Sequence, residues 1–164
     1  MFDSGFERAR SILVIPGLSP GVSPKRVRVL LAGHHAYQLY AHVTWHTWKR
    51  VGCVNRSAAR DVIIAVGCAA RRTSTIVLRS AVLADHVHVL VSFRPDTRLS
   101  DFVRLAKTIA AFRANRRVPG AVKWARGFYV ASLHKTILPA VDRYIADQYD
   151  RHPDRIPRPD RGSS

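Results

Sequence analysis

The stretch ADHVHVLVSF, residues 84–93, places two histidines one residue apart inside a run that is otherwise apolar and rich in valine. Such a run is typical of a strand that is buried on at least one face. Because side chains alternate between the two faces of a strand, His86 and His88 point to one side of the sheet and the intervening valines to the other. The stretch therefore predicts two imidazole rings side by side on one face of a sheet.

The hydrophobic period changes in a definite order around this stretch. It predicts, in chain order, a strand over 36–48, a helix after Ser57, strands over 73–84 and 86–93, a helix over 99–115, a strand over 127–132 and a helix over 136–148. The order β, α, β, β, α, β, followed by one more helix, is the split βαβ pattern of an α+β, ferredoxin-like sandwich. In this fold one antiparallel sheet carries helices on one face. Many unrelated activities occur on it, so the fold alone does not decide the function.

Local signals predict how the helices are built. Ser57 is expected as the N-cap of the first helix, with Val62, Val66 and Ala69 on its buried face. Pro139 is tolerated in the first turn of the last helix, where its missing N–H has no partner to lose. The buried stripe of the second helix is expected to be Phe102, Leu105, Ile109 and Phe112.

The composition indicates one globular domain with a polyanionic partner. The chain has 164 residues, of which 47% are apolar, and 27 Lys and Arg against 11 Asp and Glu give a net charge of +16. Such an excess favours nucleic acid over a membrane surface, because the basic residues are spread through the folded region. The alternative is an arginine-rich protein without such a partner. No apolar run approaches the length of a membrane span or signal peptide, so a cytoplasmic protein is expected.

The chain is expected to divide into three segments. Residues 36–150 form the predicted domain, while 1–35 and 151–164 are rich in proline and are expected to be poorly ordered. Cys53 and Cys68 have no metal-ligand spacing and are expected to be reduced thiols.

A His-x-His pair on one strand face suits one divalent cation or one phosphate group. The alternative is a pair of ordinary histidines on a half-exposed strand. Histidine-triad hydrolases need a third alternating histidine, but Leu90 stands at that position. Two-histidine phosphoesterases need His-x-Thr/Ser on two strands. His42 and Thr44 fit one of these motifs, but His88 occupies the hydroxyl position of the other.

The last helix carries a second candidate pair. Tyr144 and Gln148 are four residues apart and share a helical face. A phenol is a weak nucleophile at neutral pH and needs an electrophile polarised by a cation, and an amide oxygen can complete a cation's ligand shell. The residues therefore predict a cation held by His86, His88 and Gln148 beside Tyr144. The alternative is a packing tyrosine above a solvated glutamine.

Three segments in order resemble the small single-tyrosine transposases of the HUH nuclease superfamily, which serve insertion sequences that move as single-stranded DNA. They are Asp85 with the His-Val-His motif and VLVSF, then WARGFYVAS at 124–132, and then RYIADQ at 143–148. The resemblance covers residues 36–150 and extends to the REP-associated tyrosine transposases.

The resemblance implies a mechanism, a metal and partners. Tyr144 is expected to attack a DNA phosphate and form a 5′-phosphotyrosine, which a free 3′-hydroxyl later resolves. One Mg²⁺ or Mn²⁺ is expected at His86, His88 and Gln148, with Asp85 orienting a histidine or serving only as a turn residue. The implied substrate is single-stranded DNA with hairpins at the ends of a mobile element. A homodimer is implied, in which one subunit's tyrosine can complete its partner's site.

Weaker candidates for DNA binding are basic and aromatic residues, each of which is individually as consistent with a solvated charge or a core aromatic: Arg104, Lys107, Arg113, Arg116, Arg117, Trp45 and His46.

Other functions remain open. They include a regulatory or catalytically inactive nucleic-acid-binding protein on the same fold, and a domesticated relative that acts on repeated palindromes. A replication initiator or relaxase shares the chemistry but is commonly larger.

Overall fold

The computed structural model describes residues 12–13 and 39–160. The rest of the N-terminal segment and residues 161–164 lie outside the described residues, and so do the expectations about their order. The described elements are β1 (Ile12–Leu13), β2 (Leu39–His46), η1 (Trp48–Arg50), α1 (Arg56–Arg72), β3 (Ile76–Val82), β4 (His86–Phe93), α2 (Leu99–Arg117), β5 (Tyr129–Leu133), η2 (Lys135–Ile137), α3 (Leu138–Ala146), α4 (Gln148–Arg151) and η3 (Pro153–Arg155).

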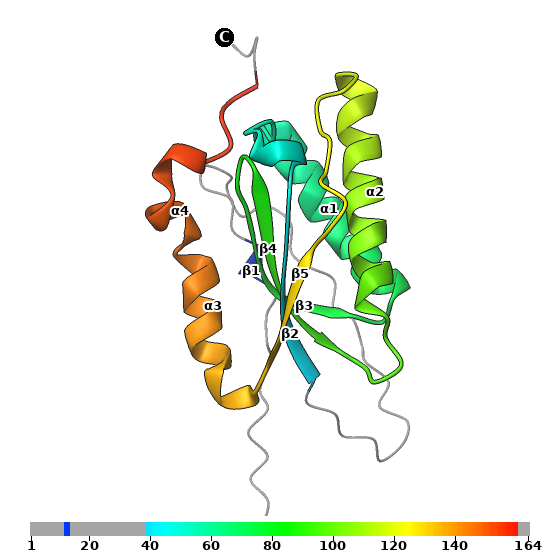
Figure 1. Cartoon of the computed structure of the whole chain (residues 1–164), viewed down its shortest axis with the longest axis vertical. Helices are drawn as coiled ribbons and strands as arrows, with labels where there is room; N and C mark the ends of the chain where they lie inside the picture. Colours follow the sequence, from blue (N-terminus) through cyan, green and yellow to red (C-terminus); the bar gives the residue numbers. More distant parts are fainter. Residues whose placement is uncertain (1–11, 14–38, 161–164) are drawn as a thin grey trace, which may run out of the picture.

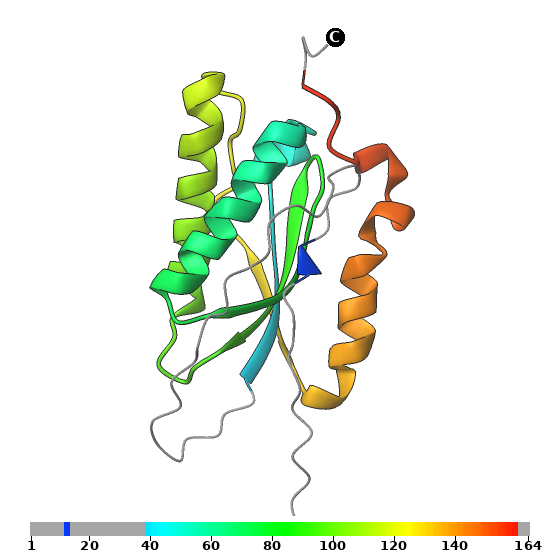
Figure 2. The ribbon, with the colours of Figure 1, turned by 180° about the vertical axis from the view of Figure 1, so that it is seen from behind.

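The fold is the expected α+β sandwich. The sheet has the order β1-β3-β4-β2-β5, and its four longer strands pair with one another in antiparallel fashion. The short strand β1 adds a parallel edge beside β3. Helices α1 and α2 cover one face of the sheet, and the C-terminal helices α3 and α4 lie on the other (Figure 1; Figure 2 shows the same layers from behind).

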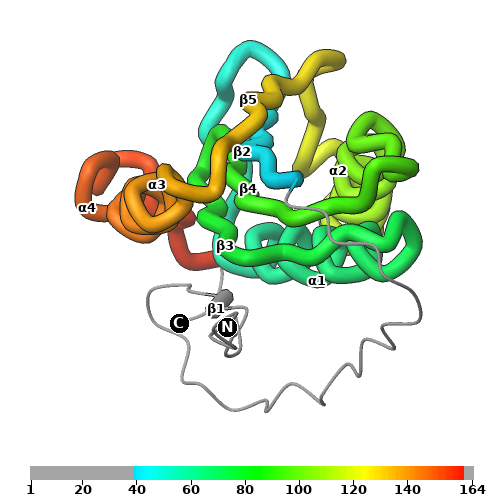
Figure 3. The backbone as a smooth tube through the Cα atoms, turned by 90° about the horizontal axis from the view of Figure 1, so that it is seen from below, coloured from blue at the N-terminus to red at the C-terminus, as the bar shows by residue number. Residues whose placement is uncertain are grey.

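Each face of the sheet has its own core. The valines of β4 at positions 87, 89 and 91 pack with Val43 and Trp45 of β2 against α1 and α2. On the opposite face, Leu90 of β4 packs with Ile145 and Tyr149 from the C-terminal helices. Seen from below, the sheet separates these two helical layers (Figure 3). Strand alternation therefore leaves His86 and His88 together on one face, as the sequence predicts, and this face is the one that α3 and α4 cover.

Two local predictions about the helices are wrong. The N-cap of α1 is Asn55, whose side chain accepts a hydrogen bond from the Ala58 N–H at 2.9 Å, and Ser57 lies inside the helix. In α2 the predicted stripe is right at Phe102, which is buried, and at Leu105 and Ile109, which pack against the core. It is wrong at Phe112, which is 63% exposed. The fully buried side chains of α2 are Phe102, Val103, Ala106, Ala110 and Ala114.

The C-terminal segment that was expected to be poorly ordered packs back onto the domain over residues 152–160. Its backbone accepts hydrogen bonds from Ala84 N–H at Arg155 and from Arg56 N–H at Arg158, at 2.7 and 2.9 Å. Pro157 is buried, and Ile156 packs against the core beside α3. The segment thus joins the β3–β4 turn to the start of α1.

Candidate active site

The site begins with the register between β2 and β4. His46 pairs with His86, and Thr44 pairs with His88, so β2 contributes its own polar side chains to the face that carries the two histidines. The rings of His86 and His88 are 4.9 Å apart between centroids and nearly perpendicular. The sequence prediction that the two rings lie side by side on one face agrees with this arrangement.

His88 is held by a third histidine. Its Nδ1 lies 2.9 Å from Nε2 of His42 on β2, and the two rings stack with centroids 5.1 Å apart. Burial, and then the neighbouring imidazoles of His86, His42 and His152, lower the pKa of His88 to about 3. His88 is therefore neutral at neutral pH, with Nε2 as the ring nitrogen left for another partner.

His86 is held by a carboxylate. Its Nδ1 lies 2.6 Å from Oδ1 of Asp85, while Oδ2 of Asp85 accepts a hydrogen bond from Arg155 at 2.7 Å. Burial lowers the pKa of His86, and the hydrogen bond and charge of Asp85 oppose that shift. A ring whose Nδ1 bonds to a carboxylate is fixed in orientation and presents Nε2 as a ligand.

Gln148 contributes a buried oxygen that has no partner. The side chain is fully buried, and its Nε2 donates to the carbonyl of Tyr144 at 3.0 Å. Its Oε1 accepts no hydrogen bond from the described part of the chain. Buried acceptors in proteins are normally satisfied, so this unpaired oxygen, in a cavity that two imidazoles also line, is available to a cation or another donor.

Tyr144 reaches the histidines within the same chain. Its ring centroid lies 5.9 Å from that of His88 and 6.0 Å from that of His42, in both cases edge to face. The side chain is 39% exposed, and the guanidinium of Arg151 lies 5.3 Å from the ring centroid. The helix is interrupted here, because α3 ends at Ala146 and α4 starts at Gln148, yet the four-residue spacing still brings both side chains to one site.

These side chains line one cavity of about 220 Å³, whose walls come from Thr44, Trp45, His46, Arg50, His86, His88, Tyr144, Gln148, His152 and Arg155. Within residues 39–160, no cluster of three or more His, Cys, Asp or Glu side chains is arranged to hold a metal ion. A cation here would thus take two imidazole nitrogens and the unpaired amide oxygen of Gln148. That mixed set suits a divalent ion such as Mn²⁺ or Mg²⁺.

Some of the weaker DNA-binding candidates are buried or bonded within the protein, and others remain accessible to DNA. Trp45 is 1% exposed and belongs to the core, so it cannot stack on a base. Arg113 and Arg117 both bind the buried carboxylate of Asp61. Lys107 donates to the carbonyls of residues 125, 126 and 127, which orders the segment before β5.

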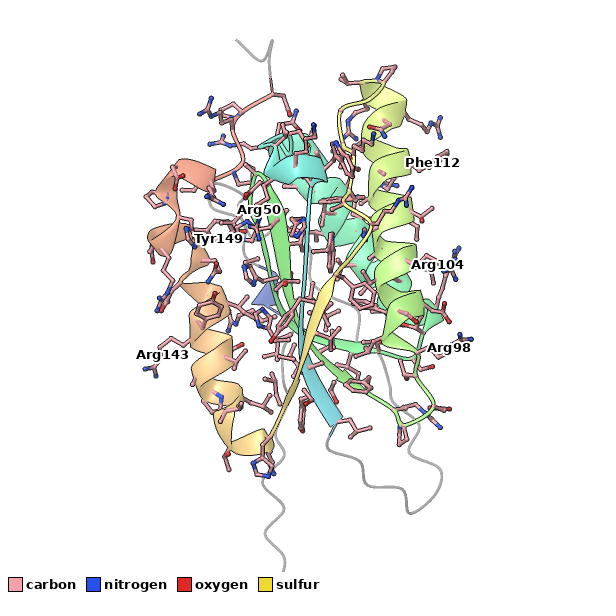
Figure 4. All side chains as sticks on the ribbon, in the orientation of Figure 1. Arg50, Arg98, Arg104, Phe112, Arg143 and Tyr149 are labelled. Carbon is pink, nitrogen blue, oxygen red and sulfur yellow. The ribbon has the colours of Figure 1, made fainter. Side chains whose placement is uncertain are left out.

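The other candidates stay accessible or lie at the cavity. Arg104 pairs with Asp101 on the surface of α2 at 3.3 Å, and Arg116 lies over the exposed ring of Phe112. Figure 4 shows Arg104 and Phe112 on the outer side of α2, away from α3 and α4. His46 lines the cavity, where its Nδ1 is buried without a partner among the described residues.

Sequence reasoning missed four residues of the site. They are Arg50, Arg155, His152 and, as a partner of His88, His42. His152 follows Gln148 by four residues, and Gln148 follows Tyr144 by the same spacing. This repeat could have predicted that His152 lies on the same side as the other two residues. The pairing of Arg155 with Asp85 spans 70 residues and leaves no local pattern.

The described part of the chain contains no helix that is both long enough and apolar enough to span a membrane.

Comparisons with known proteins agree with the geometry. The family model described as "Transposase IS200 like" matches residues 35–148, well over half of the chain. The ISDra2 transposase TnpA of Deinococcus radiodurans is 24% identical over 124 residues, which cover 71% of this chain and 89% of that protein.

Two solved structures share the fold. A transposase crystal structure from Deinococcus radiodurans R1 superposes with a TM-score of 0.56 at 21% identity, covering 73% of this chain and 98% of that one. The REP-associated tyrosine transposase bound to a REP hairpin superposes with a TM-score of 0.59 at 14% identity, covering 74% of each chain. The family match, the order of the strands and the histidine face together establish that this chain belongs to the IS200-like transposase family.

Proposed function

We propose that the chain cuts and rejoins single-stranded DNA at hairpin-flanked ends through a covalent link to Tyr144, with a divalent cation held by His86, His88 and Gln148. The observation that carries the proposal is the unpaired Oε1 of the fully buried Gln148, in one cavity with both imidazoles and the phenol. Buried amide oxygens usually accept a hydrogen bond, so this one is available to a cation. Membership of a transposase family supports DNA cleavage and transfer in general terms.

In the proposed reaction the Oη of Tyr144 attacks a backbone phosphorus. The new O–P bond forms as the bond from phosphorus to the 3′-oxygen breaks, the phenol gives up its proton, and the 3′-oxygen leaves as a hydroxyl. A bound cation would stabilise the charge that develops on the phosphate and on the leaving oxygen. The reverse attack by another 3′-hydroxyl rejoins DNA without an external energy source, because one phosphodiester replaces another through the 5′-phosphotyrosine.

The partners of this reaction are proposals as well. A solved relative carries a REP hairpin, which supports hairpin DNA as the bound form here. In this chain Tyr144 already lies beside His88 of the same subunit, so we propose that cleavage occurs in cis. The homodimer stays a prediction, and it is not needed to complete this site.

The test is adduct formation with single-stranded DNA that carries a hairpin, in Mn²⁺ and then in EDTA. Wild-type protein should form a covalent protein–DNA product in Mn²⁺ only, and Tyr144→Phe should form none. Tyr129→Phe is the matched control, because Tyr129 is a 62% exposed tyrosine on β5. Hairpin binding without any adduct in the wild type would instead favour the regulatory, non-catalytic alternative.

A further inference from the structure

A strained turn follows β2 at the mouth of the cavity. Lys49 and Arg50 in η1 both have left-handed backbone, with φ of 53° and 54°. Within the described ranges only one other non-glycine residue, Ser74, has a positive φ. Two adjacent side-chain-bearing residues in this region are unfavourable, and such strain persists only where the surroundings impose it.

The surroundings that impose this turn are buried hydrogen bonds. Thr47 is fully buried, and its N–H donates to the carbonyl of Asp85 at 2.8 Å. Its hydroxyl donates to the carbonyl of Val51 at 2.7 Å, and the Trp48 N–H donates to the carbonyl of Lys123 at 2.7 Å. The turn is thus tied to the residue that orients His86 and to the segment that leads into β5.

Arg50 is the cation that this turn presents to the site. It lines the cavity of Tyr144 and also an adjoining one of about 230 Å³ that includes Asp85 and Arg155. In Figure 4 Arg50 lies near the sheet on the side of α4, far from the outer arginines of α2. Across residues 39–160 its guanidinium has no carboxylate partner, whereas Arg155 is committed to Asp85. An arginine left unpaired at such a cavity is suited to a phosphate.

Trp48 occupies the same turn with its ring partly in solvent. It is 44% exposed, and the ammonium of Lys123 lies 5.1 Å from its ring centroid. The chain has three tryptophans, and Trp45 and Trp124 instead pack edge to face with their centroids 6.4 Å apart. Exposed aromatic rings beside cations are the usual platforms for stacking single-stranded bases.

We propose that Trp48 and Arg50 form a nucleotide-binding element, in which Arg50 contacts the phosphate that enters the cavity and Trp48 stacks on an adjacent base of single-stranded DNA. The assignment of that phosphate as the one attacked by Tyr144 rests on the proposed function. In this view the left-handed backbone at Lys49 and Arg50 would direct the side chains of Trp48 and Arg50 toward one DNA strand.

The binding test uses Tyr144→Phe protein in EDTA, titrated with a short oligothymidylate. Binding should quench tryptophan fluorescence, and Trp48→Phe should remove the quench because the other two rings are less accessible. Arg50→Gln should weaken binding about tenfold and make the salt slope shallower by about 0.7, the value for one phosphate contact on a single strand. Lys49→Gln is the matched control, with the same charge change in the same turn but no contact with the cavity.

The reaction test repeats the pair of variants in protein that retains Tyr144. Arg50→Gln should slow adduct formation by about 100-fold at saturating DNA, while Lys49→Gln stays near wild type. If quenching survives in Trp48→Phe, or if the two turn variants behave alike in binding, the nucleotide-binding element is wrong. Binding as expected with no adduct in the wild type would overturn the proposed catalysis and leave this element standing.

Discussion

At the scale of single residues, the site depends on which nitrogen or oxygen each side chain leaves unpaired. Nδ1 of His86 is taken by Asp85, Nδ1 of His88 by His42, and Nε2 of Gln148 by a backbone carbonyl. The atoms that remain are Nε2 of His86, Nε2 of His88 and Oε1 of Gln148. These three potential ligands have no other strong partner among the described residues. The site therefore holds a buried, unpaired acceptor at a cost to stability, as functional sites often do.

Replacing Gln148 with methionine tests whether the unpaired oxygen lowers the stability of the fold and serves to bind a cation. Gln148→Met keeps the volume but removes the unpaired oxygen and the bond from Nε2 to the Tyr144 carbonyl. We expect the metal-free variant to match or exceed wild type in its free energy of unfolding, by up to about 2 kcal/mol, because an unsatisfied buried acceptor is gone. Its affinity for Mn²⁺ should fall at least about tenfold, which corresponds to about 1.4 kcal/mol.

The measurements are denaturant unfolding in EDTA and isothermal titration with Mn²⁺. A variant that is strongly destabilised in EDTA yet binds Mn²⁺ normally would make Gln148 a structural residue and remove it from the ligand set.

Residue-level prediction succeeded where the signal is local. The alternation of β4 correctly assigned His86 and His88 to one face, and the four-residue spacing correctly brought Tyr144 and Gln148 to one site. His42 could not be predicted as a partner of His88, because that contact depends on the register between strands 46 residues apart in sequence.

At the scale of elements, periodicity predicted the order of strands and helices but not how tightly they pack. In α2 the expected stripe is buried at Phe102 and partly buried at Leu105 and Ile109. The alanines at positions 106, 110 and 114, which the stripe did not include, are buried as well. Phe112, the last residue of the expected stripe, is exposed. The segment after α4 was expected to be poorly ordered because its prolines and charges are typical of loops. The hydrogen bonds that hold it to the domain join residues far apart in the sequence.

That C-terminal segment positions the face that carries His86 and His88 through Arg155. The guanidinium of Arg155 holds Asp85, and Asp85 in turn holds the ring of His86. Arg155→Gln should leave the fold intact but lower Mn²⁺ affinity by about 10- to 100-fold, the usual effect of losing a partner that orients a ligand. Isothermal titration measures the affinity, and far-UV circular dichroism reports the fold.

The control for this prediction is Arg158→Gln, three residues further along the same segment. The exposed Arg158 takes part through its backbone carbonyl, which the substitution retains. Equal loss of Mn²⁺ affinity in both variants would mean that the charge of the segment matters and the contact with Asp85 does not.

At the scale of the whole molecule, the net charge of +16 overstates the positive charge that is free to bind DNA. Part of the basic charge is used internally, since Asp61 binds Arg113 and Arg117, and Asp142 binds Arg79. The hydrogen bond of Arg117 to Asp61 raises the pKa of Arg117, as expected for a cation fixed to a carboxylate. Composition predicted the polyanionic partner but could not separate charges that hold α1 to α2 from charges that face solvent.

The salt dependence of DNA binding, measured in two variants of α2, distinguishes charges that pair within the protein from charges that face solvent. The affinity of Tyr144→Phe protein for single-stranded hairpin DNA should fall linearly on a log–log plot against salt, by about 0.7 per phosphate contact. Arg116→Gln removes an exposed cation and should make the slope shallower by up to about 0.7 without loss of stability. Arg113→Gln removes a partner of a 2% exposed carboxylate and should destabilise the fold by about 1–3 kcal/mol while leaving the slope near wild type. Filter binding over a salt series and urea unfolding supply the two readouts, and a flat salt dependence in the parent protein would contradict nucleic acid as the partner of this charge.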